Sequence, residues 1–269
     1  MIKNKGIAVP YLVWIVAFIA APLAIVLYFA FTDKAGQFTL ENIMNLGQYT
    51  PVFMRSIVLA VIATVVCLVL AFPLSFMLSR MRVSRQSMML MLIMLPMWMN
   101  FLLRTYAWMS LLETNGLINR FLGLFGLGPF QMINTAGAVV LGMVYNYSPY
   151  MILPLYTIMV KIDQSVIEAA QDLGANVWRV VTKVLIPLSM DGITTGITMV
   201  FVPSVSTFII SRMLGGGSNL LIGDLIELQF LGNSYNYNLG SAMSLMLMVI
   251  VLLCMSFTTA DTEGMEGMV

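Results

Sequence analysis

The chain has 269 residues, of which 60% are hydrophobic and 9% are charged, with a formal net charge of +1 and no histidine. Soluble globular proteins carry about 25% charged residues, so this chain cannot cover its surface with water-facing groups, and its outer surface must face lipid. The chain has no run of basic residues that would indicate binding to nucleic acid. Histidine is the commonest general base and transition-metal ligand, so an intramembrane hydrolase with a Ser-His or His-metal site is excluded.

Six apolar segments follow one another along the chain. About 20 mostly apolar residues cross a hydrocarbon core of about 30 Å, and such spans must be helices because open strands cannot satisfy their backbone in lipid. We predict an all-α integral membrane protein with a single domain over residues 1–269. Its six transmembrane helices are expected at about 7–31, 56–79, 86–103, 135–160, 184–211 and 239–260. The first run is too long for the apolar core of a signal peptide and is expected to remain in the protein.

Lysine and arginine residues indicate the orientation. With both termini in the cytoplasm, eight of them lie inside and five outside, and the short loop SRMRVSR at 79–85 contributes most. Short loops count most in the positive-inside rule, so we predict a multi-pass protein with both termini cytoplasmic. The loop 161–183, between the fourth and fifth spans, is then cytoplasmic as well.

This loop carries a polar, helix-forming insert. Either Asp163 or Ser165 can cap the start of a helix, and Glu168 follows Ser165 at the spacing of a capping box. Gly174 is placed to end that helix in the left-handed conformation, and a second short helix is expected after it. Pro187 suits the first turn of the element that follows. The sequence therefore predicts two short helices that project from the membrane.

The residues alone leave two interpretations of this insert open. In the first, Ala169 and Ala170 allow close approach to a groove in another protein, where Glu168 pairs with a basic group. In the second, the insert is a solvated hairpin that only connects two spans.

The spacing resembles the cytoplasmic signature of the permease subunits of ABC importers. Its matching positions are Glu168, Ala169, Ala170, Gly174, Val184, Ile186 and Pro187. The resemblance implies a type I ABC-importer permease fold, in which the coupling loop 161–183 docks on a separate ATPase. The docking residues would be Glu168, Ala169, Ala170, Asp172, Gly174 and Pro187. Val184 and Ile186 stand where family members often have Ile and Leu.

Longer stretches resemble the spermidine/putrescine permeases, and the resemblance covers nearly the whole chain. They are LPMWMNFLLRTYAWMSLLETNGLIN, NYSPYMILPLYTIMVKIDQSVIEAAQDLGA and MLGGGSNLLIGDLIELQFL. The resemblance implies polyamine import across a bacterial cell membrane, with a homologous permease subunit, an ATP-binding subunit dimer and an extracellular or periplasmic substrate-binding protein as partners. It implies that this chain is not an enzyme, has no catalytic residue, metal site or cofactor, and leaves ATP and Mg to the ATPase. The acidic tail DTEGMEGMV departs from relatives, which often end in basic residues.

Other functions remain open at this point. The solute could be an amino-acid-like cation, a metal or an oxyanion, and a stand-alone secondary transporter or a membrane scaffold is also compatible with the composition. Seven residues are candidates for a translocation path, by aromatic or polar character near the spans: Trp98, Asn100, Tyr106, Tyr147, Asp191, Asp224 and Glu227. For the aromatic ones an interfacial belt is the alternative. For Asp191 we favour a helix cap over a role in the path.

Three further patterns have simpler explanations. Arg104 would repel a polyamine, so we expect it in an ion pair or in the docking of an external partner. The run GGGSNLL lacks the Gly-Lys-Ser/Thr ending of a phosphate-binding loop and is expected to be a turn. The small residues of GITTGITMV suit close contacts between helices.

Overall fold

The computed structural model describes residues 9–217, 219–232 and 235–266, and it confirms an all-helical chain. Within these residues the only β-type pairing is an isolated antiparallel bridge between Thr32 and Phe38. The elements in chain order are α1 (Val9–Ile15), η2 (Val16–Ala20), α2 (Ala21–Ala30), α3 (Glu41–Met44), η3 (Asn45–Tyr49), α4 (Thr50–Ser79), α5 (Val83–Trp98), α6 (Phe101–Leu112), α7 (Leu117–Gly123), α8 (Ala136–Met159), α9 (Gln164–Asp172), α10 (Val177–Val180), η4 (Val181–Leu185), α11 (Ile186–Leu188), α12 (Met190–Ser206), α13 (Ile209–Gly215), α14 (Ile222–Leu231) and α15 (Tyr237–Glu266).

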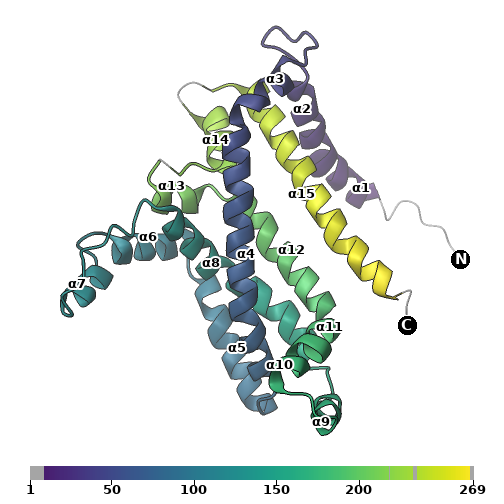
Figure 1. The fold of residues 1–269 in the computed structure, drawn as a ribbon. Coiled ribbons are helices and arrows are strands. Elements are labelled where there is room, and N and C mark those ends of the chain that lie inside the picture. The colour runs from purple at the N-terminus through teal and green to yellow at the C-terminus, as the bar shows by residue number, and fades with distance from the viewer. Residues whose placement is uncertain (1–8, 218, 233–234, 267–269) are drawn as a thin grey trace, which may run out of the picture.

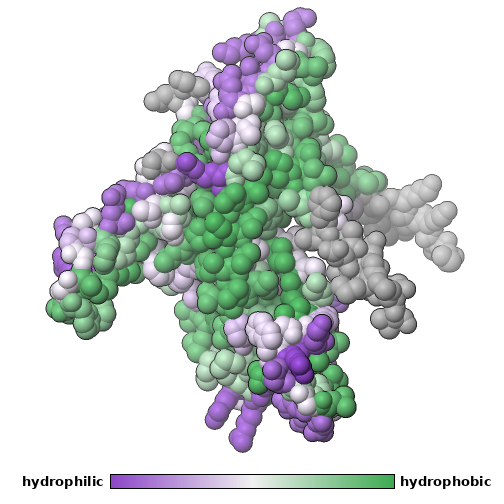
Figure 2. Space-filling model, in the orientation of Figure 1, coloured by the Kyte–Doolittle hydropathy of each residue, from purple (hydrophilic) through white to green (hydrophobic). Residues whose placement is uncertain are grey.

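Four helical segments are long and apolar enough to cross a membrane: Val9–Ala30, Glu41–Ser79, Ala136–Met159 and Tyr237–Ser256. Two bent helix pairs raise the number to six if each pair is one span. Figure 2 shows an apolar surface over the middle of the molecule and hydrophilic residues gathered towards its two ends. The all-α membrane fold is thus confirmed, although two of the six expected spans are not straight.

The first bend separates α5 from α6. The expected span 86–103 is not one helix, because α5 ends at Trp98 and the next helix runs at 89° to it. Met99 and Asn100 are extended, and the Asn100 side chain accepts a hydrogen bond from Leu102 N at 2.8 Å, which caps α6. This cap starts a helix in a new direction. The α6–α7 segment therefore projects sideways as an arm (Figure 1).

The second bend separates α11 from α12. The expected span 184–211 contains a 73° change of direction at Ser189 and a break at Thr207, which is extended. The helix from Met190 to Ser206 provides the part that packs inside the bundle. The polar insert before the bend is therefore joined to a membrane helix through a corner.

The core is formed by α4, α8 and α12, and the two most extensive helix contacts of the described chain are those of α8 with α4 and with α12. Small residues allow this. A Cβ atom added to Gly196 would lie 2.5 Å from Met151 Sδ and 3.5 Å from the Met151 backbone, so α12 approaches α8 closely only because this residue is glycine. The close contacts expected from GITTGITMV are thus confirmed.

Outside this core, α15 packs against α2, α12 and α14 (Figure 1). Buried residues from α4, α12, α14 and α15 form one hydrophobic cluster there, which includes Phe53, Phe201, Ile222 and Met243. The loop 31–40, between α2 and α3, lies at the end of the molecule opposite α9 (Figure 1). The α9 end and the 31–40 end are therefore formed by different segments of the chain.

Candidate functional site

The polar insert folds into a hairpin of two short helices, α9 and α10, at one end of the molecule (Figure 1). Asp163 is the N-cap of α9, and its Oδ1 accepts a hydrogen bond from Ser165 N at 3.0 Å. This hydrogen bond lowers the pKa of the exposed Asp163 carboxyl. Ser165 lies inside the helix, so the expected capping box between Ser165 and Glu168 is wrong, and the alternative cap, Asp163, is the one that forms.

The end of α9 is set by Gly174. Its φ is +81°, as expected for a left-handed helix terminus. Ala175 N donates to Ala170 O at 3.0 Å and Gly174 N donates to Gln171 O at 2.8 Å. These two bonds are the pair that defines a Schellman motif. Asn176 then caps α10 by accepting from Arg179 N at 2.9 Å, which makes the hairpin compact.

The inner face of the hairpin is seated on the membrane bundle. Ile167 of α9 is only 4% exposed and clusters with Val180 and Leu185. Phe72 and Phe76 of α4 pack against this cluster. In addition, Arg80 Nη1 donates to Ile162 O at 3.0 Å, which ties the end of α4 to the residue before the cap. The hairpin is therefore fixed to α4 by both apolar and polar contacts.

The outer face of the hairpin carries apolar side chains that nothing in the described chain covers. Leu173 is 89% exposed, Trp178 73% and Val177 74%. Glu168 and Asp172, which lie four residues apart on α9, are also exposed, as is Ala169. Ala170 is half-buried against the inner cluster. Pro187 lies in the first turn of α11, as expected. An exposed apolar patch rimmed by charge is typical of a protein interaction site.

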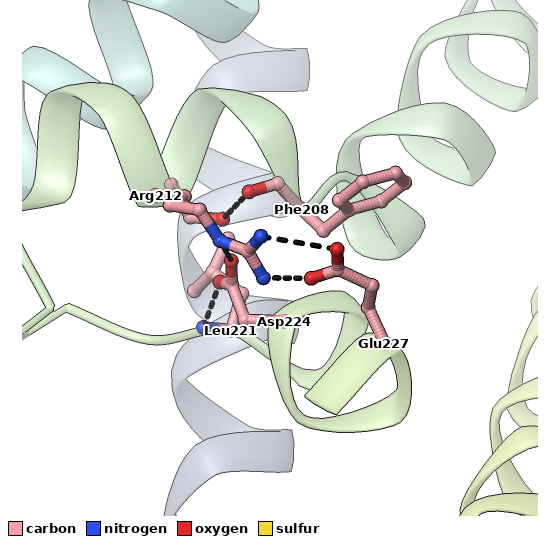
Figure 3. A network of polar contacts seen from close by, with 6 residues as sticks. Phe208, Arg212, Leu221, Asp224 and Glu227 are labelled. Carbon is pink, nitrogen blue, oxygen red and sulfur yellow. Dashed lines mark hydrogen bonds and ion pairs between the residues drawn. The ribbon is translucent and has the colours of Figure 1, made fainter. Parts of the chain in front are cut away.

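The opposite end of the molecule contains a charge network that joins α13 to α14 (Figure 3). Arg212 of α13 forms a two-point ion pair with Glu227 of α14, one contact being Nη1 to Oε1 at 3.0 Å. Arg212 Nε also lies 4.0 Å from Oδ1 of Asp224, whose side chain is fully buried. Asp224 Oδ2 accepts from Leu221 N at 2.8 Å and caps α14. The network therefore holds the two short helices together.

Asp224 is held by several partners, yet burial raises the pKa of its carboxyl. The Ser211 hydroxyl, the Leu221 amide and the Arg212 guanidinium each act in the opposite direction. Ile222 N donates to Ser56 Oγ at 2.8 Å, so α14 is also attached to α4. This end of the molecule is thus closed by contacts within the chain.

The other proposed path residues are scattered. Trp98 and Tyr106 are exposed at the end of α5 and on the α6–α7 arm, Asn100 caps α6, and Tyr147 is half-buried on α8. Asp191 lies in the first turn of α12. Ser189 occupies the N-cap position of this helix, and no side chain forms a capping hydrogen bond there. The capping role expected of Asp191 is therefore wrong.

Asp191 instead lines a cavity of about 470 Å³ between α8 and α12. Tyr150 and Thr157 of α8 and Thr195 of α12 line the same cavity. Sequence reasoning missed Thr157 and Thr195, although Thr157 follows Tyr150 by seven residues on α8 and Thr195 follows Asp191 by four on α12, which puts polar groups on one face of each helix. A polar face at membrane depth usually faces protein or a water-filled path rather than lipid.

Comparisons with known proteins agree with this architecture. Residues 6–261 match the family described as binding-protein-dependent transport system inner membrane component. The spermidine/putrescine transport system permease protein PotB of Haemophilus influenzae is 36% identical over 250 residues, which are 89% of this chain and 87% of that protein. PotB of Escherichia coli is 35% identical over 248 residues, 88% of this chain and 90% of the relative.

A solved structure shares the fold. A chain of a bacterial ABC transporter involved in the import of the acidic polysaccharide alginate superposes with a TM-score of 0.80, at 14% identity, over 96% of this chain and 94% of that one. At this identity the likeness concerns the fold alone. The family match and the relatives establish the rest: the chain belongs to the inner-membrane components of binding-protein-dependent transport systems, and it is a permease subunit of an ABC importer whose ATPase is a separate subunit.

Proposed function

We propose that this permease subunit imports a polyamine, and that the α9–α10 hairpin is the surface on which the ATP-binding subunit docks. The observation that carries the docking is the difference between the two faces of the hairpin. Its inner face is fixed to α4, whereas its outer face exposes Leu173 and Trp178 beside Glu168 and Asp172. An exposed tryptophan next to charges is the composition of an interface centre.

The attachment of the hairpin explains how motion reaches the membrane. A displacement of α9 is passed to Phe72 and Phe76 of α4 through packed side chains, because protein interiors have low compressibility. The Arg80 to Ile162 hydrogen bond acts in parallel. The chain continues from α10 through the corner at Ser189 into α12. One docking event therefore moves two of the three core helices together.

The orientation follows from docking and from charge. The SRMRVSR loop lies at the same end as the hairpin (Figure 1), and this basic cluster supports a cytoplasmic location for that end and for the proposed docking surface. Both termini are then cytoplasmic. The α13–α14 network faces outwards, towards the substrate-binding protein.

The cavity beside Asp191 is our candidate for this subunit's share of the path. A carboxylate with tyrosine and threonine hydroxyls suits an organic ammonium. A homologous permease subunit that faces α8 and α12 would cover the cavity and complete it. Asp224 and Glu227 form ion pairs with Arg212, so they contribute to the translocation path only in a state in which Arg212 has moved away. Trp98, Asn100, Tyr106 and Tyr147 lie outside this cavity's lining, and of these Tyr147 is nearest in sequence to Tyr150.

The docking is tested by purification. Trp178→Ala is expected to reduce co-elution of the ATP-binding subunit with the assembled permease by about ten-fold or more, as for a residue at an interface centre. Trp14→Ala is the matched control, because Trp14 is an exposed tryptophan on α1, far along the chain from the hairpin. Equal co-elution of both variants would place the ATPase elsewhere.

The substrate is tested by uptake into proteoliposomes that contain the assembled importer and its binding protein. We expect spermidine or putrescine to be taken up with ATP hydrolysis. Asp191→Asn is expected to raise the half-saturating polyamine concentration by about ten-fold, the value of one charge-assisted hydrogen bond. Glu41→Gln, in α3 and outside the lining of this cavity, should leave that concentration unchanged. Uptake of an amino acid, metal or oxyanion in place of polyamines would refute the substrate while leaving the docking intact.

A further inference from the structure

A cavity at the end opposite the hairpin has no role in the function proposed above. It has a volume of about 680 Å³ and lies where α2 ends and α15 begins. Four aromatic residues line it, Tyr28, Phe29, Tyr235 and Tyr237, together with the charged pair Asp33 and Lys34. The cavity therefore combines several rings with one charge of each sign.

The rings are contiguous. Ring centroids lie 5.5 Å apart for Tyr28 and Phe29, 6.4 Å for Phe29 and Tyr237, and 5.1 Å for Tyr235 and Tyr237. A Cβ atom added to Gly36 would lie 3.5 Å from the Tyr28 hydroxyl, so this ring reaches the loop after α2. Clustered ring faces attract organic ammonium groups through the aromatic quadrupole.

The floor of the cavity is held in place by buried hydrogen bonds. Asn238 is 7% exposed, and its Nδ2 donates to Thr32 O at 2.6 Å and to Phe29 O at 3.1 Å. From the other side, Asn42 Nδ2 donates to Thr32 O at 2.8 Å and to Ala30 O at 3.2 Å. The end of α2 is thus locked to α15 and to α3. A site held in this way loses little entropy when a ligand binds.

Asp33 is fixed in the same loop. Its Oδ1 accepts hydrogen bonds from Ala35 N and Gln37 N, both at 2.8 Å, and its own amide donates to Gln37 O at 2.9 Å. Both side-chain bonds use Oδ1, so the carboxylate is fixed to this turn beside the rings. Lys34 follows directly and supplies a cation at the same rim.

The position of the cavity limits its ligand. Of two segments that can cross the membrane, Val9–Ala30 ends here and Tyr237–Ser256 begins here, so the cavity lies at the boundary between hydrocarbon and water. Below it, Ile25 and Leu27 of α2 are exposed and apolar. Figure 2 shows hydrophilic residues at this end above the apolar surface. A ligand with a polar head and apolar tails matches this arrangement, in which a polar cavity lies above an apolar helix surface.

We propose that this cavity binds the headgroup of a zwitterionic phospholipid, with the ammonium among the four rings beside Asp33, the phosphate at Lys34, and the acyl chains along the exposed side of α2. An interfacial aromatic belt would explain scattered tyrosines. It does not explain four adjoining rings around one hollow with a fixed carboxylate. A free polyamine would use the rings and Asp33, but it would be repelled by Lys34. The proposal does not depend on which solute the importer carries.

The test uses the assembled importer, purified in detergent and mixed with equal amounts of phosphatidylethanolamine and phosphatidylglycerol that have the same acyl chains. Native mass spectrometry counts the lipid retained. The wild-type complex is expected to retain the ethanolamine lipid in preference. Asp33→Asn, which keeps Oδ1 as an acceptor for the loop, and Tyr235→Ala should each lower that retention by about 2- to 30-fold. Lys34→Gln should lower retention of both lipids, because both carry phosphate.

Tyr11→Ala is the matched control, since Tyr11 is an exposed tyrosine of the first span outside this cavity. It should leave the preference unchanged. A photoactivatable ethanolamine lipid should label peptides that contain residues 28–38 and 235–238, a readout that needs no variant. Equal retention of both lipids by the wild type, or displacement of the ethanolamine lipid by spermidine at equal concentration, would overturn the proposal. The second result would show a site for free amines instead.

Discussion

The two ends of this permease subunit treat their charged residues in opposite ways. On the α9–α10 hairpin, Glu168 and Asp172 are exposed, and within the described residues neither forms an ion pair. At the other end, Arg212 forms ion pairs with Glu227 and with the buried Asp224 (Figure 3). Charges paired within the chain stabilise its own fold, whereas exposed charges beside uncovered Leu173 and Trp178 are available to another subunit. The comparison separates residues that hold the permease together from residues that we propose couple it to the ATPase.

Replacing one arginine at each end tests this comparison most strongly. Arg212→Met leaves the Asp224 carboxylate buried without its cation. Breaking a fully buried pair costs about 3–5 kcal/mol, and we expect about 2 kcal/mol because Arg212 is half exposed. Arg179→Met, on the exposed face of the hairpin, should change the free energy of unfolding by less than about 0.5 kcal/mol. Thermal unfolding of the assembled importer in detergent measures both, and equal shifts would contradict the distinction.

Two glycines sharpen the comparison at the hairpin. A Cβ atom meets nothing within 4 Å at either Gly174 or Gly123, but only Gly174 has positive φ. Gly174→Val is therefore expected to cost about 1–3 kcal/mol of local backbone strain and to uncouple ATP hydrolysis from transport. Gly123→Val, at the end of α7, should leave coupling unchanged. Full coupling in the Gly174 variant would mean that coupling does not depend on the backbone conformation of the hairpin at Gly174.

The network can also be tested by pH. Burial raises the folded-state pKa of Asp224 above its unfolded value, so the folded protein binds more protons between the two pKa values. Stability should therefore fall as the pH rises from the unfolded pKa through the folded pKa, and should level off above it. Asp224→Asn removes this titration. Unfolding temperatures of wild type and variant across that window should converge at low pH and separate as the pH rises. Parallel curves would show that titration of Asp224 does not change stability.

The smallest expected effect concerns the cap of α9. Asp163→Ala removes the side chain that accepts from Ser165 N and should destabilise the start of the helix by about 1 kcal/mol. Ser165→Ala should have almost no effect, because Ser165 is not the cap. Hydrogen exchange of the amides at 165–167 compares the two variants. A larger loss of protection in the Ser165 variant would contradict this assignment and support the capping box between Ser165 and Glu168.

Local signals in the sequence predicted much of the hairpin. Gly174 acts on its own neighbours, so the end of α9 could be predicted without the fold, and a second helix was expected after it. Asn176, which caps that second helix, was not singled out. The choice between Asp163 and Ser165 could not, since both suit an N-cap. The Arg80 to Ile162 hydrogen bond, which spans 82 positions, holds the chain directly before Asp163 and favours that cap.

The bends and the side-chain clusters were harder to predict. A hydropathy window averages over a break of one or two residues, so the corners at Met99 and Ser189 were hidden within runs that look continuous. The local signal at the first corner was Asn100, which can cap a new helix. Partners distant in the sequence, such as Tyr150 beside Asp191, depend on the register of α8 against α12. That register is set by packing at Gly196.

The early end of α5 has a consequence for the surrounding lipid. Its 16 residues cover about 24 Å at 1.5 Å per residue, which is less than the hydrocarbon thickness of about 30 Å. Where α5 stops and the α6–α7 arm turns aside, the bilayer must become thinner or the arm must lie within the leaflet farther from the hairpin. Turnover of the importer should therefore respond to acyl-chain length, with longer chains placing strain on the elbow between Trp98 and Phe101.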